Sequence, residues 1–278
     1  MDGLPLFKEK KSLRCEKRHH FDLAREGYCN LLLVQEKSSR DPGDKKEMVA
    51  SRGKFLNGGH FSPVADRLFE FVCDIATKAG SDAPLRIVDA GCGEGYYLHR
   101  LKELAIANGH PAKLELAGFD ISKWAVKAAA KRSMEIAWAV AGNRRLPFAP
   151  NSVDLILSMF GFPILESFKD IQSVGGHVLL VDPGADHLIE LRKIIYPKVD
   201  VNGPPRFSGA ALNCGYLLKR EGSLRFSASL ESASQIQDLL SMTPHTFRIQ
   251  KKRREDLAAL KRLTVSVDLV FRILQREV

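Results

Sequence analysis

The residues best suited to chemistry lie where an apolar run ends in an acid and three alternating glycines follow. Asp89 precedes Gly91, Gly93 and Gly95, and a helical pattern begins directly after them. Glycines let a ligand approach the backbone closely, and the first turn of a helix offers free N–H groups. This order is typical of a nucleotide-like ligand bound at the end of a parallel strand.

A second acid narrows the choice of ligand. Asp120 ends the next predicted strand and could accept hydrogen bonds from both ribose hydroxyls, while Glu94 lies at the start of the helix. A dinucleotide site prefers Gly-x-Gly-x-x-Gly with an acid about 20 residues on. Here the third glycine comes one residue early and Asp120 lies 29 residues after Gly91. The spacing favours S-adenosylmethionine (SAM) over NAD, with Gly91 to Gly95 against the methionine part.

Three later segments could complete such a site. Asn143 follows a predicted strand, where a polar group can read the adenine edge. Phe160-Gly-Phe-Pro163 follows the fourth predicted strand, where SAM-dependent enzymes hold the acceptor; an aromatic there could stack on a nucleobase or be an ordinary core residue. His187 opens a helix after the fifth strand, where it could point into the cleft or be structural.

The elements that would position these residues alternate between strand and helix. Strands are expected at 85–90, 113–120, 135–140, 153–159 and, after a turn at Gly175-Gly176, 177–181; helices are expected from 62, at 95–108, 122–132 and 188–195. Short strands at 216–219 and 224–227, a helix at 233–242 and an alternating strand at 265–273 predict a final antiparallel hairpin. We therefore expect an α/β fold of the class I SAM-methyltransferase (Rossmann-like) type, with a mostly parallel seven-stranded sheet.

The composition of the 278 residues is that of a globular protein, with 45% hydrophobic and 27% charged residues. No apolar run approaches the ~20 residues that span a membrane, and no secretory signal is recognisable. Five scattered cysteines are unlike a disulfide framework, so we expect a cytoplasmic protein. The net charge of +9 favours a polyanionic partner, although a solvated basic surface explains it equally well.

The N-terminal region differs from the rest, and we divide the chain into a module at 1–34, a linker or flap at 35–60 and a catalytic domain at 61–278. Cys15 and His19 have the spacing of two zinc ligands. A structural zinc needs four, and no Cys-x₂-Cys pair accompanies them, so these residues alone favour a free cysteine beside solvated histidines. The linker contains the turn-forming sequence Arg40-Asp-Pro-Gly-Asp44.

Together these segments resemble the 23S rRNA (guanine-N1-)-methyltransferases of the RlmA type. The likeness covers nearly the whole chain, in the stretches 20–32, 39–44, 59–61, 89–97, 120–132, 146–148, 183–188 and 242–244. The first two stretches are far more specific than the glycine motif, because that motif is compatible with thousands of different methyl acceptors.

The resemblance implies a zinc-ribbon-like RNA-recognition module followed by a SAM-dependent catalytic domain, often in a homodimer. The substrate would be a guanine in a hairpin loop of 23S rRNA, methylated at N1. By the same resemblance, SAM contacts fall on Phe61, Gly93, Glu94 and His187. Two zinc ligands fall on Cys15 and His19.

Two departures from the family pattern keep alternatives open. The first Cys-x₂-Cys pair would fall at or before Asp2 and is absent, so either an N-terminal segment is missing from this sequence or the module has lost its metal. Phe160-Gly-Phe-Pro163 stands where the family tends to carry Tyr or Phe followed by Ala-Pro. The alternatives are a small-molecule methyltransferase and a SAM-binding RNA-interaction protein without catalysis. No residue is identified as the base that removes the N1 proton.

Overall fold

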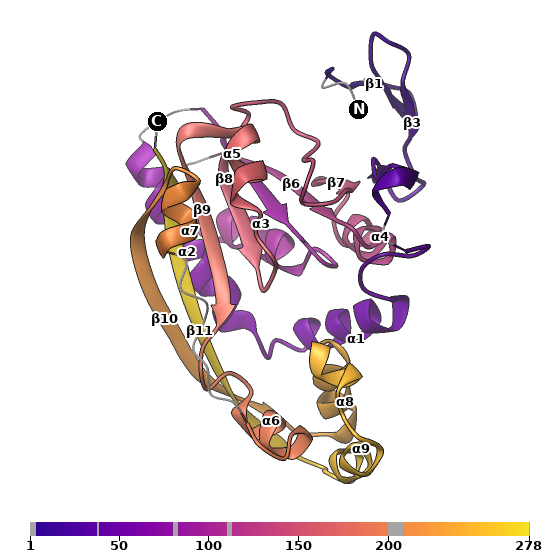
Figure 1. The fold of residues 1–278 in the computed structure, drawn as a ribbon, viewed down its shortest axis with the longest axis vertical. Helices are drawn as coiled ribbons and strands as arrows, with labels where there is room; N and C mark the ends of the chain where they lie inside the picture. Colours follow the sequence, from indigo (N-terminus) through magenta and orange to yellow (C-terminus); the bar gives the residue numbers. More distant parts are fainter. Residues whose placement is uncertain (1–3, 38, 80–82, 110–112, 200–207, 278) are drawn as a thin grey trace.

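A computed structural model describes residues 4–37, 39–79, 83–109, 113–199 and 208–277 (Figure 1). Its centre is an eight-stranded sheet in the order β10-β11-β9-β8-β5-β6-β7-β4. The strands of the sheet are β4 (Cys29–Asn30), β5 (Leu85–Ala90), β6 (Leu114–Asp120), β7 (Ala137–Val140), β8 (Val153–Met159), β9 (Gln172–Pro183), β10 (Tyr216–Leu230) and β11 (Leu263–Arg276). The pairs from β4 to β9 are parallel, and β10 and β11 run antiparallel. The predicted α/β fold is confirmed, with the two-residue β4 as an additional strand.

Nine α-helices and two 3₁₀ turns surround the sheet in the described parts of the chain. They are η1 (Val34–Glu36), α1 (Lys46–Asn57), α2 (Ser62–Ala79), α3 (Tyr96–Ala107), α4 (Lys123–Arg132), α5 (Leu165–Ile171), α6 (Ile189–Ile195), α7 (Ser208–Asn213), α8 (Ala233–Ser241), η2 (Pro244–Phe247) and α9 (Lys251–Ala258). The Oγ of Ser122 accepts a hydrogen bond from the N–H of Ala125 and thereby caps α4. None of the described helices is long and apolar enough to cross a membrane.

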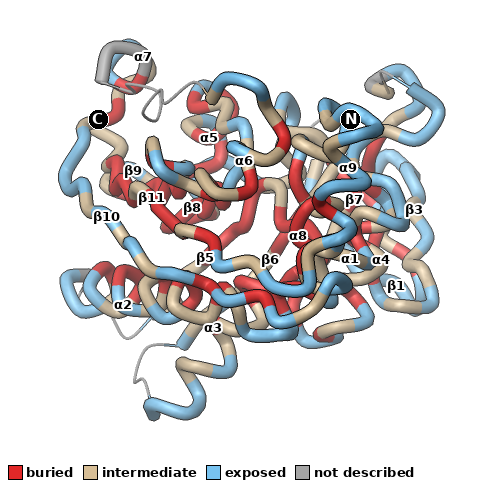
Figure 2. The backbone as a smooth tube through the Cα atoms, turned by 90° about the horizontal axis from the view of Figure 1, so that it is seen from below, coloured by how far each residue is buried: buried red, intermediate tan, exposed pale blue. Residues whose placement is uncertain are grey.

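The sheet buries an apolar layer on each face, because successive side chains of a strand point to opposite sides. Ile87 and Leu155 belong to the larger cluster, which includes residues of α2, α3 and α4. Val88 and Ile156, each the next residue along its strand, belong to the second cluster with residues of α5. Figure 2 shows the buried residues concentrated along these central strands. This two-sided burial explains why β5 and β8 are almost continuously apolar.

Two details of the strand prediction were wrong. The expected turn at Gly175-Gly176 lies inside β9, where a positive φ at Gly175 and a shifted register against β8 allow the strand to continue. The two short strands expected at 216–219 and 224–227 are parts of one strand, β10, paired with β11 over its whole length apart from a register shift near Arg220. The residues between them, 220–223, are mostly exposed because β10 is an edge strand, so their polarity does not mark the end of a strand.

The N-terminal residues form a small antiparallel sheet of β1 (Phe7–Glu9), β2 (Ser12–Arg14) and β3 (His20–Asp22) at the periphery of the molecule (Figure 1). Residues 1–3 of the predicted module and residue 38 of the predicted linker lie outside the described residues. The linker contains the helix α1, which contacts α3, α4 and α8 and buries Val49, Phe55 and Leu56. The domain boundaries themselves stay predictions.

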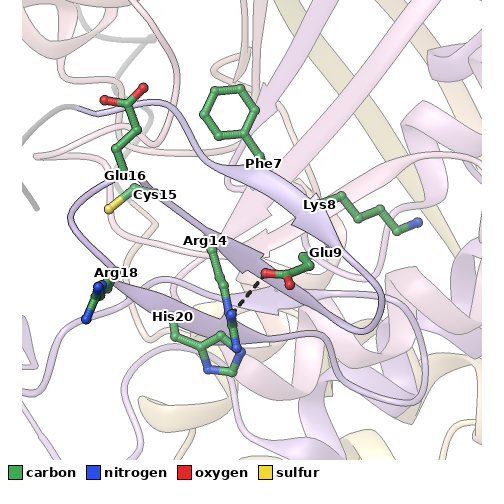
Figure 3. A pocket seen from close by; sticks show the side chains of 8 residues that line it. All are labelled: Phe7, Lys8, Glu9, Arg14, Cys15, Glu16, Arg18 and His20. Carbon is green, nitrogen blue, oxygen red and sulfur yellow. Dashed lines mark ion pairs between the residues drawn. The ribbon is translucent and has the colours of Figure 1, made fainter.

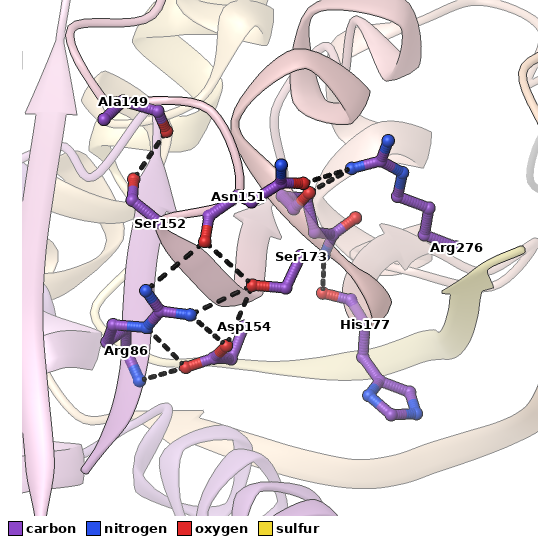
Figure 4. Close-up of polar contacts among 9 residues, drawn as sticks. Arg86, Ala149, Asn151, Ser152, Asp154, Ser173, His177 and Arg276 are labelled. Carbon is purple, nitrogen blue, oxygen red and sulfur yellow. Dashed lines mark hydrogen bonds and ion pairs between the residues drawn. The ribbon is translucent and has the colours of Figure 1, made fainter. Parts of the chain in front are cut away.

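A polar cluster joins β5, β8 and β9 near the ends of the strands opposite the glycines (Figure 4). The guanidinium of Arg86 donates to both carboxylate oxygens of Asp154, at 2.7 and 2.9 Å, and to Ser173 at 3.0 Å. Asn151 accepts from Arg86 and from Arg276. These contacts satisfy one another across the strands, so the cluster holds the sheet together.

Candidate functional site

The glycine loop, residues 91–95, joins the end of β5 to the start of α3. Gly91, Gly93 and Gly95 have φ values of +85°, +56° and +78°, which residues with a Cβ adopt only at a cost. A Cβ on Gly95 would lie 2.8 Å from the Trp138 ring, whereas a Cβ on Gly91 would meet nothing within 4 Å. Gly95 is therefore required for packing, and Gly91 leaves room where a ligand could lie.

Asp120, at the end of β6, holds this loop from the neighbouring strand. Its Oδ2 accepts a hydrogen bond from the N–H of Gly93 at 3.0 Å, and its Oδ1 accepts one from Ser122 at 2.8 Å. Burial raises the pKa of Asp120, and these two hydrogen bonds oppose that rise. The structure thus brings Asp120 and the glycine loop together. Its hydrogen bonds to a ribose stay a prediction.

Two further carboxyl groups lie in the loop region with unsatisfied oxygens. Neither oxygen of Asp89, and not Oε1 of Glu94, has a hydrogen-bond partner among the described residues. Burial raises the pKa of Asp89 to about 8, helped by the charges of Asp120 and Glu94, and burial also raises the pKa of Glu94. Buried carboxylates of this kind favour a ligand with positive charge and N–H donors. The sulfonium and ammonium groups of SAM fit that requirement.

Phe61 and His187 approach each other from distant parts of the chain, with ring centroids 6.3 Å apart. Phe61 is buried between α1 and α2, and His187 follows β9. The N–H of Asp268 donates to Nδ1 of His187 at 3.4 Å. Burial lowers the pKa of His187 to about 4, so the ring is neutral at physiological pH. A neutral ring that accepts at Nδ1 carries its proton on Nε2 and is a donor there.

The acceptor loop, residues 160–163, follows β8 and also approaches His187. The ring of Phe160 lies 6.2 Å from that of His187 and 6.3 Å from that of Tyr97. Phe162 is 90% exposed, so it is not a core residue. The side chain of Asn143 donates to the carbonyl of Phe162 at 3.0 Å. Asn143 therefore supports the acceptor loop here, and its contact with adenine stays a prediction.

Sequence reasoning missed Arg52, a residue of α1 at this site. Its Nη2 lies 2.5 Å from Oδ2 of Asp44, and its Nη1 would lie 3.3 Å from a Cβ on Gly93. α1 lies in a segment predicted to be a linker, and a single arginine in a polar stretch does not by itself indicate a binding residue. The nearest available signal was the specific 39–44 stretch that precedes the helix.

The N-terminal module brings together only part of a metal site. The Sγ of Cys15 lies 3.3 Å from Nδ1 of His19. Within the described residues, however, no group of three or more His, Cys, Asp or Glu side chains could hold a metal ion. Two donors do not make the tetrahedral set of a structural zinc. The residues that the structure describes therefore do not fit a structural zinc.

A surface pocket lies on the N-terminal module beside Cys15 (Figure 3). Its lining consists of Phe7, Lys8, Glu9, Arg14, Cys15, Glu16, Arg18 and His20. One of its cations, Arg14, pairs with Glu9 at 3.1 Å. The pocket thus combines basic side chains with the exposed ring of Phe7.

Comparisons with known proteins match both parts of the chain. The family model described as RlmA, N-terminal, a zinc ribbon, matches residues 1–40, and a methyltransferase domain model matches residues 87–184. YxjB of Bacillus subtilis (strain 168), named provisionally as a 23S rRNA (guanine-N(1)-)-methyltransferase, is 31% identical over 265 residues, covering 93% of this chain and 89% of that protein. The 23S rRNA (guanine(748)-N(1))-methyltransferase of Streptomyces fradiae is 36% identical over 189 residues, which cover 67% of this chain and 63% of that protein.

Among solved structures, a protein of Bacillus halodurans C-125, named provisionally as a methyltransferase, superposes with a TM-score of 0.51. The match covers 74% of this chain and 98% of that one at 10% identity. At that identity the likeness establishes the fold alone.

Proposed function

Because the chain belongs to the RlmA-type family of 23S rRNA guanine-N1 methyltransferases and is a SAM-dependent methyltransferase, we propose that it methylates N1 of a guanine in a hairpin loop of 23S rRNA. The observation that carries the proposal is the extent of the likeness, which includes the N-terminal module as well as the SAM domain. A methyltransferase for a small molecule would have no use for that module.

In this proposal, the glycine loop with Asp89 and Glu94 would hold the methionine part of SAM, and Asp120 would hold its ribose. SAM would supply the methyl group to guanine N1 in an in-line transfer, with S-adenosylhomocysteine as the leaving group. Positioning of the two reactants can contribute about 7–11 kcal/mol to such a step. Phe61 and His187 line the side of the site that faces the acceptor loop, as their ring contacts indicate.

Guanine N1 carries a proton that must leave during the reaction. His187 is poorly suited to accept it, because its Nδ1 is occupied by the N–H of Asp268 and its Nε2 carries the remaining proton. His187 is instead suited to donate a hydrogen bond, either to SAM or to the base. A donor beside guanine O6 would stabilise the negative charge that develops as N1 loses its proton. The base itself stays unassigned.

The acceptor loop supports a nucleobase as substrate. Phe160 lies between the rings of Tyr97 and His187, and Phe162 extends into solvent. Stacking of a base on an aromatic ring is worth about 1–3 kcal/mol. An exposed phenylalanine beside a SAM site gains from such stacking, whereas in a ligand-free protein it contributes little to folding.

The pocket of the N-terminal module supports contact with RNA. Lys8, Arg18 and the exposed ring of Phe7 would suit phosphates and an unstacked base. The net charge of +9 acts in the same direction. A homodimer and a cytoplasmic location accompany the proposal as predictions.

The test is primer extension on 23S rRNA from cells with and without the gene, since a methyl group on guanine N1 blocks base pairing and stops reverse transcriptase. The gene should restore the stop, and a Gly95→Val version, expected to disrupt the glycine loop, should not. An unchanged pattern of stops would reject the rRNA substrate. Mass spectrometry of nucleosides from purified 23S rRNA, incubated with the protein and SAM, should detect 1-methylguanosine.

One observation favours a second candidate, a SAM-binding RNA-interaction protein without catalysis. The acceptor loop reads Phe160-Gly-Phe-Pro163, which departs from the family pattern at the position expected to hold the target base. For this candidate the purified protein would bind both SAM and rRNA but transfer no methyl group.

A further inference from the structure

Arg52 carries a positive charge from α1 to the glycine loop. Its side chain is 22% exposed, and Nη2 pairs with Oδ2 of Asp44 at 2.5 Å. Its other terminal nitrogen, Nη1, would lie 3.3 Å from a Cβ on Gly93. Asp44 therefore holds one side of the guanidinium while the other side is directed at the bare backbone of the loop.

The charges around Arg52 keep it ionised. Burial alone would lower its pKa, but the charges of Asp44, Glu94 and Asp120 outweigh this and raise it. Glu94 lies nearby and is 3% exposed. Its Oε1 lies 3.6 Å from Nη2 of Arg132 but accepts no hydrogen bond among the described residues. The Arg52 cation thus lies beside Gly93, and the next residue is Glu94, a carboxylate with one oxygen that accepts no hydrogen bond.

The methionine part of SAM carries complementary groups, a carboxylate and an ammonium on one carbon. We propose that Arg52 binds the carboxylate of this tail through Nη1, while Glu94 faces the ammonium. Guanidinium–carboxylate hydrogen bonds are charge-assisted and directional, so such a pair fixes the tail and with it the sulfonium. The inference rests on SAM as the methyl donor and is independent of the acceptor.

The same arrangement gives a role to the 39–44 segment, which the SAM motif leaves unexplained. Gly43 has φ +83°, and a Cβ there would lie 2.9 Å from both Ile121 and Ser122. The Oγ of Ser122 donates to the carbonyl of Asp44 at 2.6 Å. A further hydrogen bond, from Trp124 Nε1 to Asp41, is 2.9 Å long.

These contacts fasten the segment to the start of α4, beside Asp120. The fastened segment fixes Asp44, and Asp44 orients Arg52. Asp44 is therefore a positioning residue, and Arg52 is the residue that touches the ligand.

The test compares SAM with decarboxylated SAM, which keeps the sulfonium and the amino group but lacks the carboxylate. Isothermal titration would measure both affinities for the wild type and for Arg52→Met. The ratio of SAM to decarboxylated-SAM affinity should fall by about 10- to 100-fold in the variant, equivalent to about 1.4–2.8 kcal/mol. Lys54→Met, which removes an exposed charge from the same helix, should leave the ratio within about threefold.

Two milder variants keep the test decisive if Arg52→Met fails to fold. Arg52→Lys keeps the charge but loses the planar fork, so it should recover only part of the ratio. Asp44→Asn should lower SAM affinity about threefold to tenfold by releasing the guanidinium. An unchanged ratio in the Arg52 variants, or equal weakening of both ligands, would overturn the proposal. A wild type that binds neither ligand would instead contradict SAM dependence itself.

Discussion

Replacing Asp89 with asparagine should stabilise the ligand-free protein at alkaline pH and leave it nearly unchanged at acid pH. Asp89 is 1% exposed, and neither of its oxygens has a hydrogen-bond partner among the described residues. The charges of Asp120 and Glu94 also oppose its ionisation. Above its pKa, the wild type must therefore hold a buried, poorly satisfied charge that asparagine avoids.

The size of the effect follows from the pKa. Burial raises the pKa of Asp89 from 3.8 to about 8 in the folded protein. Between those values the folded state keeps a proton that the unfolded state has lost, so stability is greatest below pH 3.8 and is lost as pH rises toward 8. The loss is at most about 1.4 kcal/mol for each pH unit. From pH 5 to pH 8 it amounts to up to about 4 kcal/mol, or about 10 °C in Tm.

Thermal unfolding of the wild type and of Asp89→Asn from pH 5 to pH 9 would measure this. The difference in Tm between the two proteins should widen with pH, and Asp256→Asn, an exposed acid on α9, should show no such trend. Saturating SAM should narrow the difference at pH 8, because its positive charge favours the ionised carboxylate. A difference in Tm that does not change with pH would refute the reasoning.

Three further predictions concern single positions around the glycine loop and the acceptor loop. Gly95→Ala should destabilise the protein by about 2–4 kcal/mol, since its Cβ would meet Trp138 and Ala129 at a positive φ. Gly91→Ala should cost only about 1–2 kcal/mol, because its Cβ would meet nothing within 4 Å. Urea unfolding would measure both losses, and similar values would contradict the packing difference. Phe162→Ala should leave SAM affinity unchanged and weaken rRNA binding by about 1–3 kcal/mol, as titration of both ligands would show; an unaltered rRNA affinity would exclude stacking. Long-range ¹H–¹⁵N NMR should find His187 as the neutral Nε2–H tautomer down to about pH 5, because burial lowers its pKa to about 4. Titration near 6.5 would contradict the effect of burial, and an Nδ1–H tautomer would disprove the assigned hydrogen bond.

The sequence predicted most of the parallel sheet because its strands are apolar on both faces. β5 and β8 were predicted with the bounds they have, and β6 within one residue. The prediction weakened where polar residues interrupt a strand, as in β10, or where glycines mimic a turn, as in β9. In both places pairing with a neighbouring strand, a contact distant in the sequence, decided the structure.

The candidate site divides in the same way. The glycine loop and Asp120 could be predicted from the sequence, because their spacing is set within one β-α-β unit. The role of the Arg52–Asp44 pair could not be predicted, because it depends on α1 lying against a loop some forty residues later in the chain. The hydrogen-bond partner of Asn143 could not be predicted either, since it is a backbone carbonyl on another loop.

The backbone conformation of Phe160 brings its ring close to Tyr97, at the start of α3, and to His187. This residue has φ +57°, a conformation that costs a bulky side chain about 1–2 kcal/mol. The turn that this conformation permits keeps the Phe160 ring near Tyr97 and His187. The turn continues through Gly161, where a Cβ would lie 3.1 Å from the Ser158 hydroxyl. Phe162 is thereby directed outward rather than into the core. If SAM and guanine bind as proposed, this turn places one aromatic ring beside the methyl donor and leaves a second exposed to the incoming base.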